Sequence, residues 1–518
     1  MFMSHPSKHR RPAMGQTQLP APVGGLNLRD GLASMKGTDA LILDNWIPES
    51  SYCEQRRGHT SHVTGLGALP RTLMDWSGPT GSQLYAATAT AVYNVTSTGA
   101  VGAAVLSGLS GGDWSFVNFT TAGGHFLVAA NGVDAVRNYN GTTWTTPTIT
   151  GVSSTALNAV HSHKARLWFI EANSTKVWYL EPQSIAGTAT HIQVGEQLSM
   201  GGHLVAIGSI SRDGGKGGSD DLLVMISSRG QVVVYEGDDP SSANTWQRLG
   251  TFYAAPPVST RCFAQIGGDL AILTEAGIMS GRQLLLSDSS TAERTSITNK
   301  INRGVKEAFR TYGSLFGWQL TNYPRGHLLI LNVPTSSTTA NQYVMNTQTG
   351  AWCTFSGLNG LCWGLLTENL YFGTSAGTIW RADNGLYDNG SAIRTEMKSA
   401  FRAYNGGGHF RTTKIRPLFT AGNRISPAIK IDVDYRDSTP VIPTDQYPAY
   451  SSPTGTLWGS GVWGVDVWGE IGNPVADWID ASGEGTTAAI HMVTSTSGYT
   501  VQLNACDVMY EKAKGLAI

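Results

Sequence analysis

Short apolar segments recur along residues 71–387, separated by turns rich in glycine, asparagine and serine. In QLYAATATAVYNV and LLVMISSRGQVVVYEG, an apolar strand leads through a turn to a second strand rich in valine and tyrosine. This pattern is typical of β-hairpins. Seven such units are recognisable, and they begin near Leu84, Phe126, Leu167, Leu222, Leu270, Leu328 and Leu370.

These units are spaced roughly 40 to 60 residues apart, close to the ~40 to 50 residues of a propeller blade. Trp144, Trp246 and Trp352 each follow a Gly- or Asn-containing turn. A tryptophan that opens the last strand of a blade can bury its ring against the next blade. We therefore predict an all-β fold with a degenerate β-propeller of about seven blades, six to eight being compatible. A β-sandwich with accidental spacing is the alternative.

The pattern changes on both sides of the repeats. Residues 1–18 are predicted to be a disordered basic tail, and residues 19–70 an irregular N-terminal docking segment in which residues 39–47 form a short helix. Residues 71–387 form the predicted propeller, with one amphipathic helix in SITNKINRGVKEAFRTYG at 296–313. Residues 388–518 read as long alternating strands, which predict a C-terminal β-sandwich-like domain.

The amino-acid composition is consistent with many short strands and excludes some classes of function. The 518 residues include 62 glycines but only 14% charged residues, and the formal net charge is −1, which excludes a globally basic nucleic-acid binder. Five cysteines without a CxxC pair predict buried thiols in a reducing compartment. The first residues lack the apolar core of a signal peptide, and no apolar run reaches membrane-spanning length.

The candidate catalytic motifs are better explained as structure. GLSGG at 108–112 precedes a strand-like segment rather than a helix, and no helix follows GSGVWG at 459–464. His161 and His163 share one strand face as a structural pair, and the carboxylates of 213–221 lack calcium-site spacing. Tyr139 stands where a sialidase-type repeat has aspartate. We predict no enzyme activity, no polysaccharide hydrolysis, and no catalytic, cofactor or metal site.

Positive charge is concentrated between residues 394 and 430, where Glu396 is the one acidic residue. The candidates for contact with DNA or a partner protein are Arg394, Lys398, Arg402, Arg411, Lys414 and Arg416. Such a segment fits phosphate contact, docking on an acidic subunit, or a solvated sheet face. If DNA passes through a ring of this protein, we expect most of this charge to face protein or solvent, because strong phosphate contacts would resist sliding of the DNA.

Several segments resemble one family of bacteriophage proteins. They are PAPVGGLNLRDGLASMKGTDALILDNWIPE, GHFLVAANGVDAVRNYNGTTW, GSLFGWQLTNYPRGHLLILNVP, NQYVMNTQTGAWCTF and the Trp-Gly run near residue 458. Their order and spacing resemble the tail nozzle, or tail tubular protein B, of short-tailed phages, also called the packaged-DNA-stabilising hub. The likeness runs from about residue 20 to the end of the chain.

The resemblance implies a structural virion protein of the tail, assembled in the host cytoplasm. Members of the family carry a propeller and form a six-fold ring below the portal and adaptor, with double-stranded DNA in the channel and fibres or spikes nearby. It implies no cofactor, no catalytic residue and no stable membrane anchoring. The alternative is a carbohydrate-binding propeller that acts as an adhesin or receptor-binding tail protein, for which Trp458, Trp463 and Trp468 are candidate sugar platforms.

Overall fold

The structure is a computed structural model that describes residues 13–211, 221–242, 244–286, 296–436 and 473–512. The chain divides into two compact units, and neither is continuous in sequence. Unit 1 combines Met1–Arg57, Ala351–Thr354 and Leu386–Ile518, and unit 2 combines Gly58–Gly350 and Phe355–Gly385. The predicted run at 458–469 and most of the 213–221 loop lie outside the described residues.

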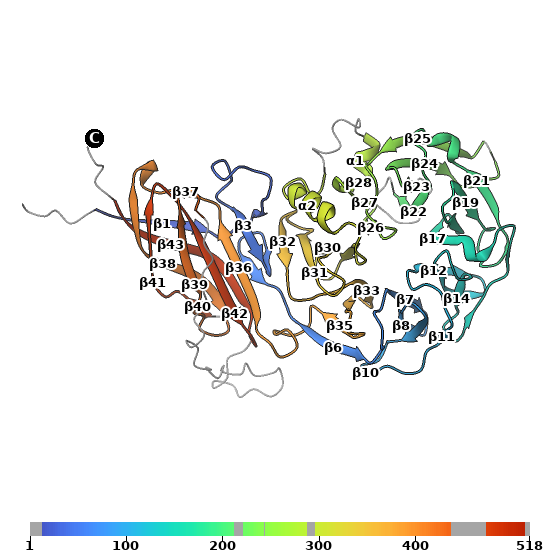
Figure 1. Ribbon diagram of the computed structural model, residues 1–518, viewed down its shortest axis with the longest axis horizontal. Coiled ribbons are helices and arrows are strands. Elements are labelled where there is room, and N and C mark those ends of the chain that lie inside the picture. Colours follow the sequence, from blue (N-terminus) through green and yellow to red (C-terminus); the bar gives the residue numbers. More distant parts are fainter. Residues whose placement is uncertain (1–12, 212–220, 243, 287–295, 437–472, 513–518) are drawn as a thin grey trace, which may run out of the picture. The chain divides into compact units, whose positions relative to one another are not determined.

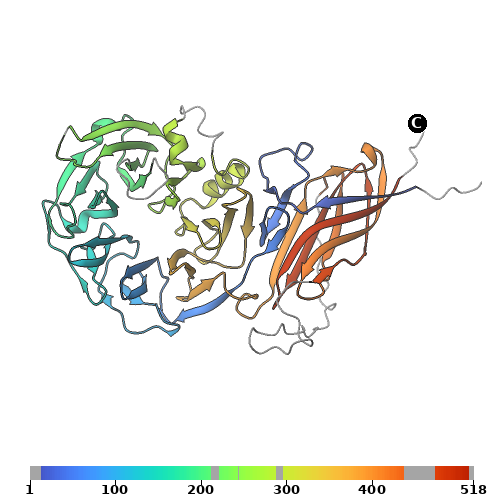
Figure 2. The same cartoon turned by 180° about the vertical axis from the view of Figure 1, so that it is seen from behind.

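Unit 2 is a β-propeller, in which small antiparallel sheets follow one another around a ring (Figure 1, and from behind in Figure 2). Four sheets come first along the chain. They are β7 (Thr72–Gly78), β8 (Gly81–Ala87), β9 (Ala91–Asn94) and β11 (Leu106–Ser107); β12 (Ser115–Thr121), β13 (Gly124–Ala130), β14 (Arg137–Tyr139) and β15 (Trp144–Thr145); β17 (Leu157–His163), β18 (Arg166–Glu171), β19 (Lys176–Tyr179) and β21 (Thr190–Gln193); and β22 (Leu204–Ile210), β23 (Leu222–Ser227), β24 (Gln231–Gly237) and β25 (Trp246–Tyr253).

The remaining sheets complete the ring. They are β26 (Phe263–Ile266), β27 (Asp269–Thr274) and β28 (Gly277–Ser280); β29 (Gln319–Tyr323), β30 (Leu328–Pro334) and β31 (Ala340–Asn346); and β33 (Cys362–Leu366), β34 (Asn369–Gly373), β35 (Ile379–Ala382) and β6 (His59–Thr64), with the short β10 (Gly99–Ala100) beside β6. A two-stranded pair, β16 (Ile149–Thr150) with β20 (Gly187–Thr188), lies between sheets in the sequence. The number of blades falls within the predicted six to eight.

The ring is closed by strands from the two ends of unit 2. β6 pairs antiparallel with β35, Val63 opposite Ile379 and His59 opposite Ala382. The innermost strand β33 in turn packs against β7, where a Cβ on Gly364 would lie 2.6 Å from the Leu73 side chain. Closure of this kind covers the hydrogen-bonding edge that an open array of sheets would leave exposed.

Two of the predicted tryptophans pack between blades. Trp246 opens β25 and stacks on Trp168 of the preceding sheet, with ring centroids 5.3 Å apart and an interplanar angle of 14°. Trp144 opens β15 and meets Tyr85 of the preceding sheet edge-on at 5.1 Å. The tryptophans open their last strands as predicted, but the expected contact with the next blade is wrong, since both rings turn back towards the preceding blade.

Trp352 follows a different pattern. It opens β32 (Trp352–Phe355), as predicted, and is 1% exposed, but residues 351–354 belong to unit 1. Its backbone lies against Gly25, which has a φ of +78°, and a Cβ at that glycine would come within 2.7 Å of the Trp352 nitrogen and oxygen. Only glycine fits this close approach of two backbones.

The described residues of unit 1 form two sheets. One holds β1 (Met14–Pro20), β4 (Trp46–Pro48), β5 (Cys53–Gln55), β38 (Phe410–Ala421), β40 (Asn473–Val475), β41 (Ile479–Gly485) and β43 (Val501–Lys512). The other includes β2 (Gly25–Leu26), β3 (Asp39–Asp44), β36 (Ile393–Ser399), β37 (Arg402–Ala403), β39 (Ala428–Val433) and β42 (Thr487–Thr496). A small shared cavity lined by Leu19, Leu503 and Cys506 of the first sheet and Met397 and Ile490 of the second shows that they pack face to face. The C-terminal sheet domain is thus present, with the N-terminal segment built into it.

Two predictions near the N-terminus are wrong. Residues 14–18 are not disordered, because Met14–Pro20 pairs with β43 along its whole length. Residues 39–47 do not form a helix but the strands β3 and β4, with a left-handed Asn45 (φ 59°) between them. The pairing of β3 with β2 and β36 outweighs the helical spacing of its apolar residues.

Helices are few in the described residues. The amphipathic helix predicted at 296–313 is present as α2 (Asn302–Tyr312), which buries Val305 and ends at Gly313. The others are α1 (Gly281–Leu286) and the 3-10 turns Ser154–Ala156, Gly195–Gln197 and Asn405–Gly407.

Candidate functional site

The predicted basic segment does not form a free positive surface. Lys398 is 4% exposed, and its Nζ lies 2.7 Å from Asp432 Oδ2, so the expectation that it faces DNA or a partner is wrong. A charged amine that is removed from water requires a carboxylate partner, and the strand β39 supplies it. Arg394 is half exposed and pairs with Glu396 at 2.6 Å.

The other candidates lie on or beside β38. Arg416 donates two bonds to Asp507 Oδ2, at 3.0 and 2.5 Å, and its guanidinium lies over the Trp478 ring at 4.7 Å. Lys414 lies 3.2 Å from Asp480. Arg411 is exposed and is flanked in register by Glu484 and Glu511, while Arg402 is exposed on β37.

The local excess of positive charge in the sequence is therefore largely balanced in the fold. β38 lies between β41 and β43, whose carboxylates are distant in sequence but adjacent in space. The result is a mixed-charge sheet face. A role in DNA or partner contact for Arg394, Arg402, Arg411, Lys414 and Arg416 stays a prediction.

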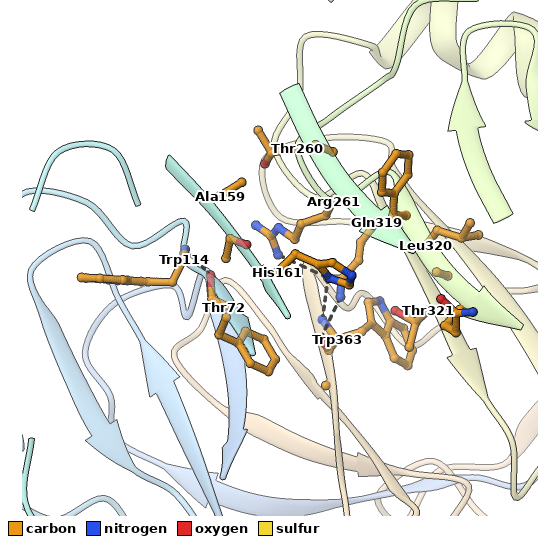
Figure 3. Close-up of a pocket in the computed structure, with 18 of the residues that line it drawn as sticks. Thr72, Trp114, Ala159, His161, Thr260, Arg261, Gln319, Leu320, Thr321 and Trp363 are labelled. Carbon is orange, nitrogen blue, oxygen red and sulfur yellow. Dashed lines mark hydrogen bonds between the residues drawn. The ribbon is translucent and has the colours of Figure 1, made fainter. Parts of the chain in front are cut away.

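A cavity lies at the centre of the propeller. Its volume is about 530 Å³, and its walls come from the innermost strands β7, β12, β17, β22, β26, β29 and β33 with the residues just before them. Figure 3 shows Arg261, Gln319, His161 and Thr72 around this space. Sequence reasoning missed the site, because its residues are scattered from 72 to 365 and share no motif.

A cluster of charged side chains adjoins the cavity, and two of its members, Asp113 and Arg261, line it. Asp113 Oδ2 accepts a bond from Arg71 at 2.7 Å, and Asp113 Oδ1 accepts one from Arg261 at 3.2 Å. Both guanidinium groups also contact the ring of Phe316, with centroid distances of 4.1 Å for Arg71 and 5.0 Å for Arg261. Arg71 precedes β7, Asp113 precedes β12 and Arg261 precedes β26, so the cluster joins separate blades.

Burial shapes the electrostatics of this cavity. It lowers the pKa of Arg261, partly offset by Asp113, although an arginine stays charged at any ordinary pH. Burial also raises the pKa of Asp75, which lines the cavity and accepts a bond from Asn118 at 3.2 Å. Asp75 follows Thr72 by three residues on β7, which places it roughly 10 Å further along the strand.

The histidine pair has a structural environment. His161 Nε2 and His163 Nδ1 lie 2.9 and 2.8 Å from the same Ser209 hydroxyl, which confirms that they share a face. Burial lowers the pKa of His163 to about 3. Across the part of the chain that the structure describes, no cluster of three histidine, cysteine or acidic side chains is arranged to hold a metal.

The remaining motifs also have structural surroundings. Ser110 of GLSGG donates its backbone N–H to Asp134, and the strand β12 follows instead of a helix. Tyr139 is buried and donates to Gln83 at 2.9 Å. All five cysteines are buried free thiols, as predicted, and burial raises the pKa of each.

Comparison with known proteins shows similarity at the level of the fold. No family model and no curated protein matches the chain. The solved structures that it resembles include the WD40 β-propeller domain of Doa1 (8% identity, TM-score 0.39, 63% of this chain and 96% of that chain), BBS1N in complex with ARL6DN (11%, 0.41, 64% and 98%) and the computationally designed Ika8 protein (12%, 0.35, 62% and 99%). Among the described residues, no helix has the length and apolar character to span a membrane.

Proposed function

We propose that this protein is a structural component of a short-tailed phage virion. In this proposal it forms the ring-shaped nozzle or hub of the tail, through which the genome passes and on which other tail parts dock. The observation that carries the proposal is the likeness of five segments, in order, to tail nozzle proteins. The β-propeller of unit 2 is the fold that this likeness implies.

The positions of the quoted segments support a scaffold role. GTDALILDNWIPE supplies β3 and β4, GHFLVAANG supplies β13, and LTNYPRGHLLILNVP supplies β29 and β30. Many of their residues are buried strand residues, including Leu43, Trp46 and Leu329. A likeness concentrated in buried core residues fits a protein with a structural rather than a catalytic role.

The path proposed for DNA runs between subunits rather than through one propeller. A cavity of about 530 Å³ is within the range of ~300 to 1,000 Å³ that small-molecule sites occupy. A double helix, whose major groove alone is about 12 Å wide, is far too large for it. A conduit for DNA therefore requires several copies around a common axis, and the family likeness suggests six.

The test is the symmetry of the assembled protein. Full-length protein is mixed with the portal–adaptor complex of its own phage and imaged by cryo-electron microscopy, with the protein alone as the control. We expect class averages with a six-fold ring at the end of the adaptor. If the protein stays monomeric, does not bind the adaptor and binds host glycans on an array, the proposal is overturned in favour of an adhesin.

A further inference from the structure

We propose that the central cavity of the propeller is a binding site for a small acidic polyol, a molecule with one carboxylate or phosphate group and several hydroxyl groups. The oxyanion would contact Arg261, and the hydroxyl groups would lie towards Asp75. The inference rests on the geometry of unit 2 and is independent of the proposed virion role.

The first argument is the number of unused donors at Arg261. A guanidinium group has five N–H donors. Within the described part of the chain, Arg261 uses one for Gln319 Oε1 and one for Asp113 Oδ1, both at 3.2 Å. Its side chain lines the cavity and keeps 19% of its surface accessible, so a solute can reach the remaining donors.

The second argument is charge. Arg71 and Arg261 share one carboxylate, Asp113, so the cluster keeps an excess of one positive charge. Arg261 is the less exposed of the two arginines, with 19% of its side chain accessible against 31% for Arg71. A charge beside a partly enclosed cavity attracts a counter-ion more strongly than the same charge in open solvent. Oxyanions with two oxygens in one plane match the fork of a guanidinium group.

The third argument is that the cluster is held in place. The Phe316 ring contacts both guanidinium groups, and Gln319, which accepts from Arg261, is itself fixed to the backbone of Trp363 by bonds of 2.8 and 3.0 Å. Groups that are already oriented lose little conformational entropy when a ligand binds.

Other residues that line the cavity indicate the chemistry of the ligand away from its anionic group. Asp75, Asn322, Gln265 and His161 also line the cavity, and Asp75 is four residues from Arg71, roughly 13 Å along the chain. A carboxylate in that position accepts hydrogen bonds from hydroxyl groups and disfavours a second anionic group. Half-buried rings of Phe116 and Phe263 also line the cavity and suit the apolar face of a sugar ring.

The experiment is calorimetric titration of the full-length protein with sodium glucuronate, with inorganic phosphate and with glucose. Glucuronate and glucose share a ring and differ in the carboxylate, so glucose is the neutral control. We expect glucuronate to bind with a Kd in the millimolar range or below, phosphate to compete with it, and glucose to bind at least tenfold more weakly.

Two substitutions test the site, and a third is the control. Arg261→Gln should weaken glucuronate binding roughly ten- to a hundredfold, the usual effect of losing a hydrogen bond to a charged group. Asp113→Asn should strengthen binding several-fold, because it raises the excess positive charge, whereas a purely structural cluster would give no gain. Arg248→Gln, an exposed arginine on β25, is the matched control and should change nothing.

If Arg261→Gln does not fold, two other variants test the site. Asp113→Asn should bind glucuronate more tightly than the wild type, and Arg71→Gln should lose binding. The proposal is overturned if neither anion binds the wild-type protein at a concentration of about 10 mM, because the Kd would then be weaker than the millimolar range expected here. It is also overturned if glucuronate binds equally to the wild type and to the folded variants.

Discussion

At the scale of single residues, stability depends on rings that lie between blades. Trp246 is 9% exposed and stacks between Trp168 and Tyr235, with centroid distances of 5.3 and 5.4 Å. Truncation of a buried tryptophan usually costs ~3 to 5 kcal/mol, because the cavity that it leaves does not collapse fully.

We therefore expect Trp246→Ala to lower the free energy of unfolding by about 3 to 5 kcal/mol. Trp144→Ala should cost less, roughly 1 to 2 kcal/mol, because its ring is only half buried. Chemical denaturation of the full chain measures both, and Leu249→Ala on the exposed side of β25 is the control. Equal stability of Trp246→Ala and the control would remove the argument for packing between blades.

The contribution of Glu396 to the stability of the folded state depends on pH. A hydrogen bond from His491 at 2.8 Å, with further help from Arg394, lowers the pKa of Glu396 from 4.5 to about 2. The ionised carboxylate therefore stabilises the folded state at any pH above about 4.5. This contribution is lost as the pH falls from about 4.5 to about 2, and it amounts to roughly 3 kcal/mol at most.

We expect Glu396→Gln to be less stable than the wild type at pH 7 and to show a flatter decline of stability between pH 4.5 and 2. Thermal unfolding over a pH series gives both quantities. Glu484→Gln, at an exposed position, is the matched control and should follow the wild-type curve. Parallel curves for Glu396→Gln and the wild type would show that the His491–Glu396 bond contributes nothing to the acid response.

At the scale of elements, β6 is the strand that closes the propeller. It lies before the repeats in sequence, yet it pairs with β35 at their end. Without it, the edge of β35 would be open to pairing with other chains.

We expect a fragment of residues 58–385 to fold as a monomer with one cooperative transition. A fragment of residues 66–385, which lacks β6, should melt at a lower temperature and self-associate. Circular dichroism melts and size-exclusion chromatography compare the two. Identical melting and elution would mean that closure through β6 is dispensable.

At the scale of the whole molecule, the two units interleave along the chain. Unit 1 receives its strands from both ends of the chain and four residues, 351–354, from the middle. Strands that are distant in sequence pair within unit 1, and the basic residues of β38 lie beside carboxylates of β41 and β43. For that reason, a charge count over a short window, such as 394–430, overestimates the charge that the surface presents.

The sequence by itself determined the all-β class, the propeller repeat, the helix α2, the buried thiols and the absence of a helical nucleophile elbow at Ser110. These are local properties, because strand periodicity, turn residues and helix spacing depend on residues that lie within a few positions of one another in the sequence. Only the tertiary structure decided that Asp39–Asp44 is a strand, that Lys398 is buried against Asp432, and that Arg71, Asp113 and Arg261 meet at one cavity. Each of these depends on partners between 34 and about 350 positions away, which no local pattern encodes.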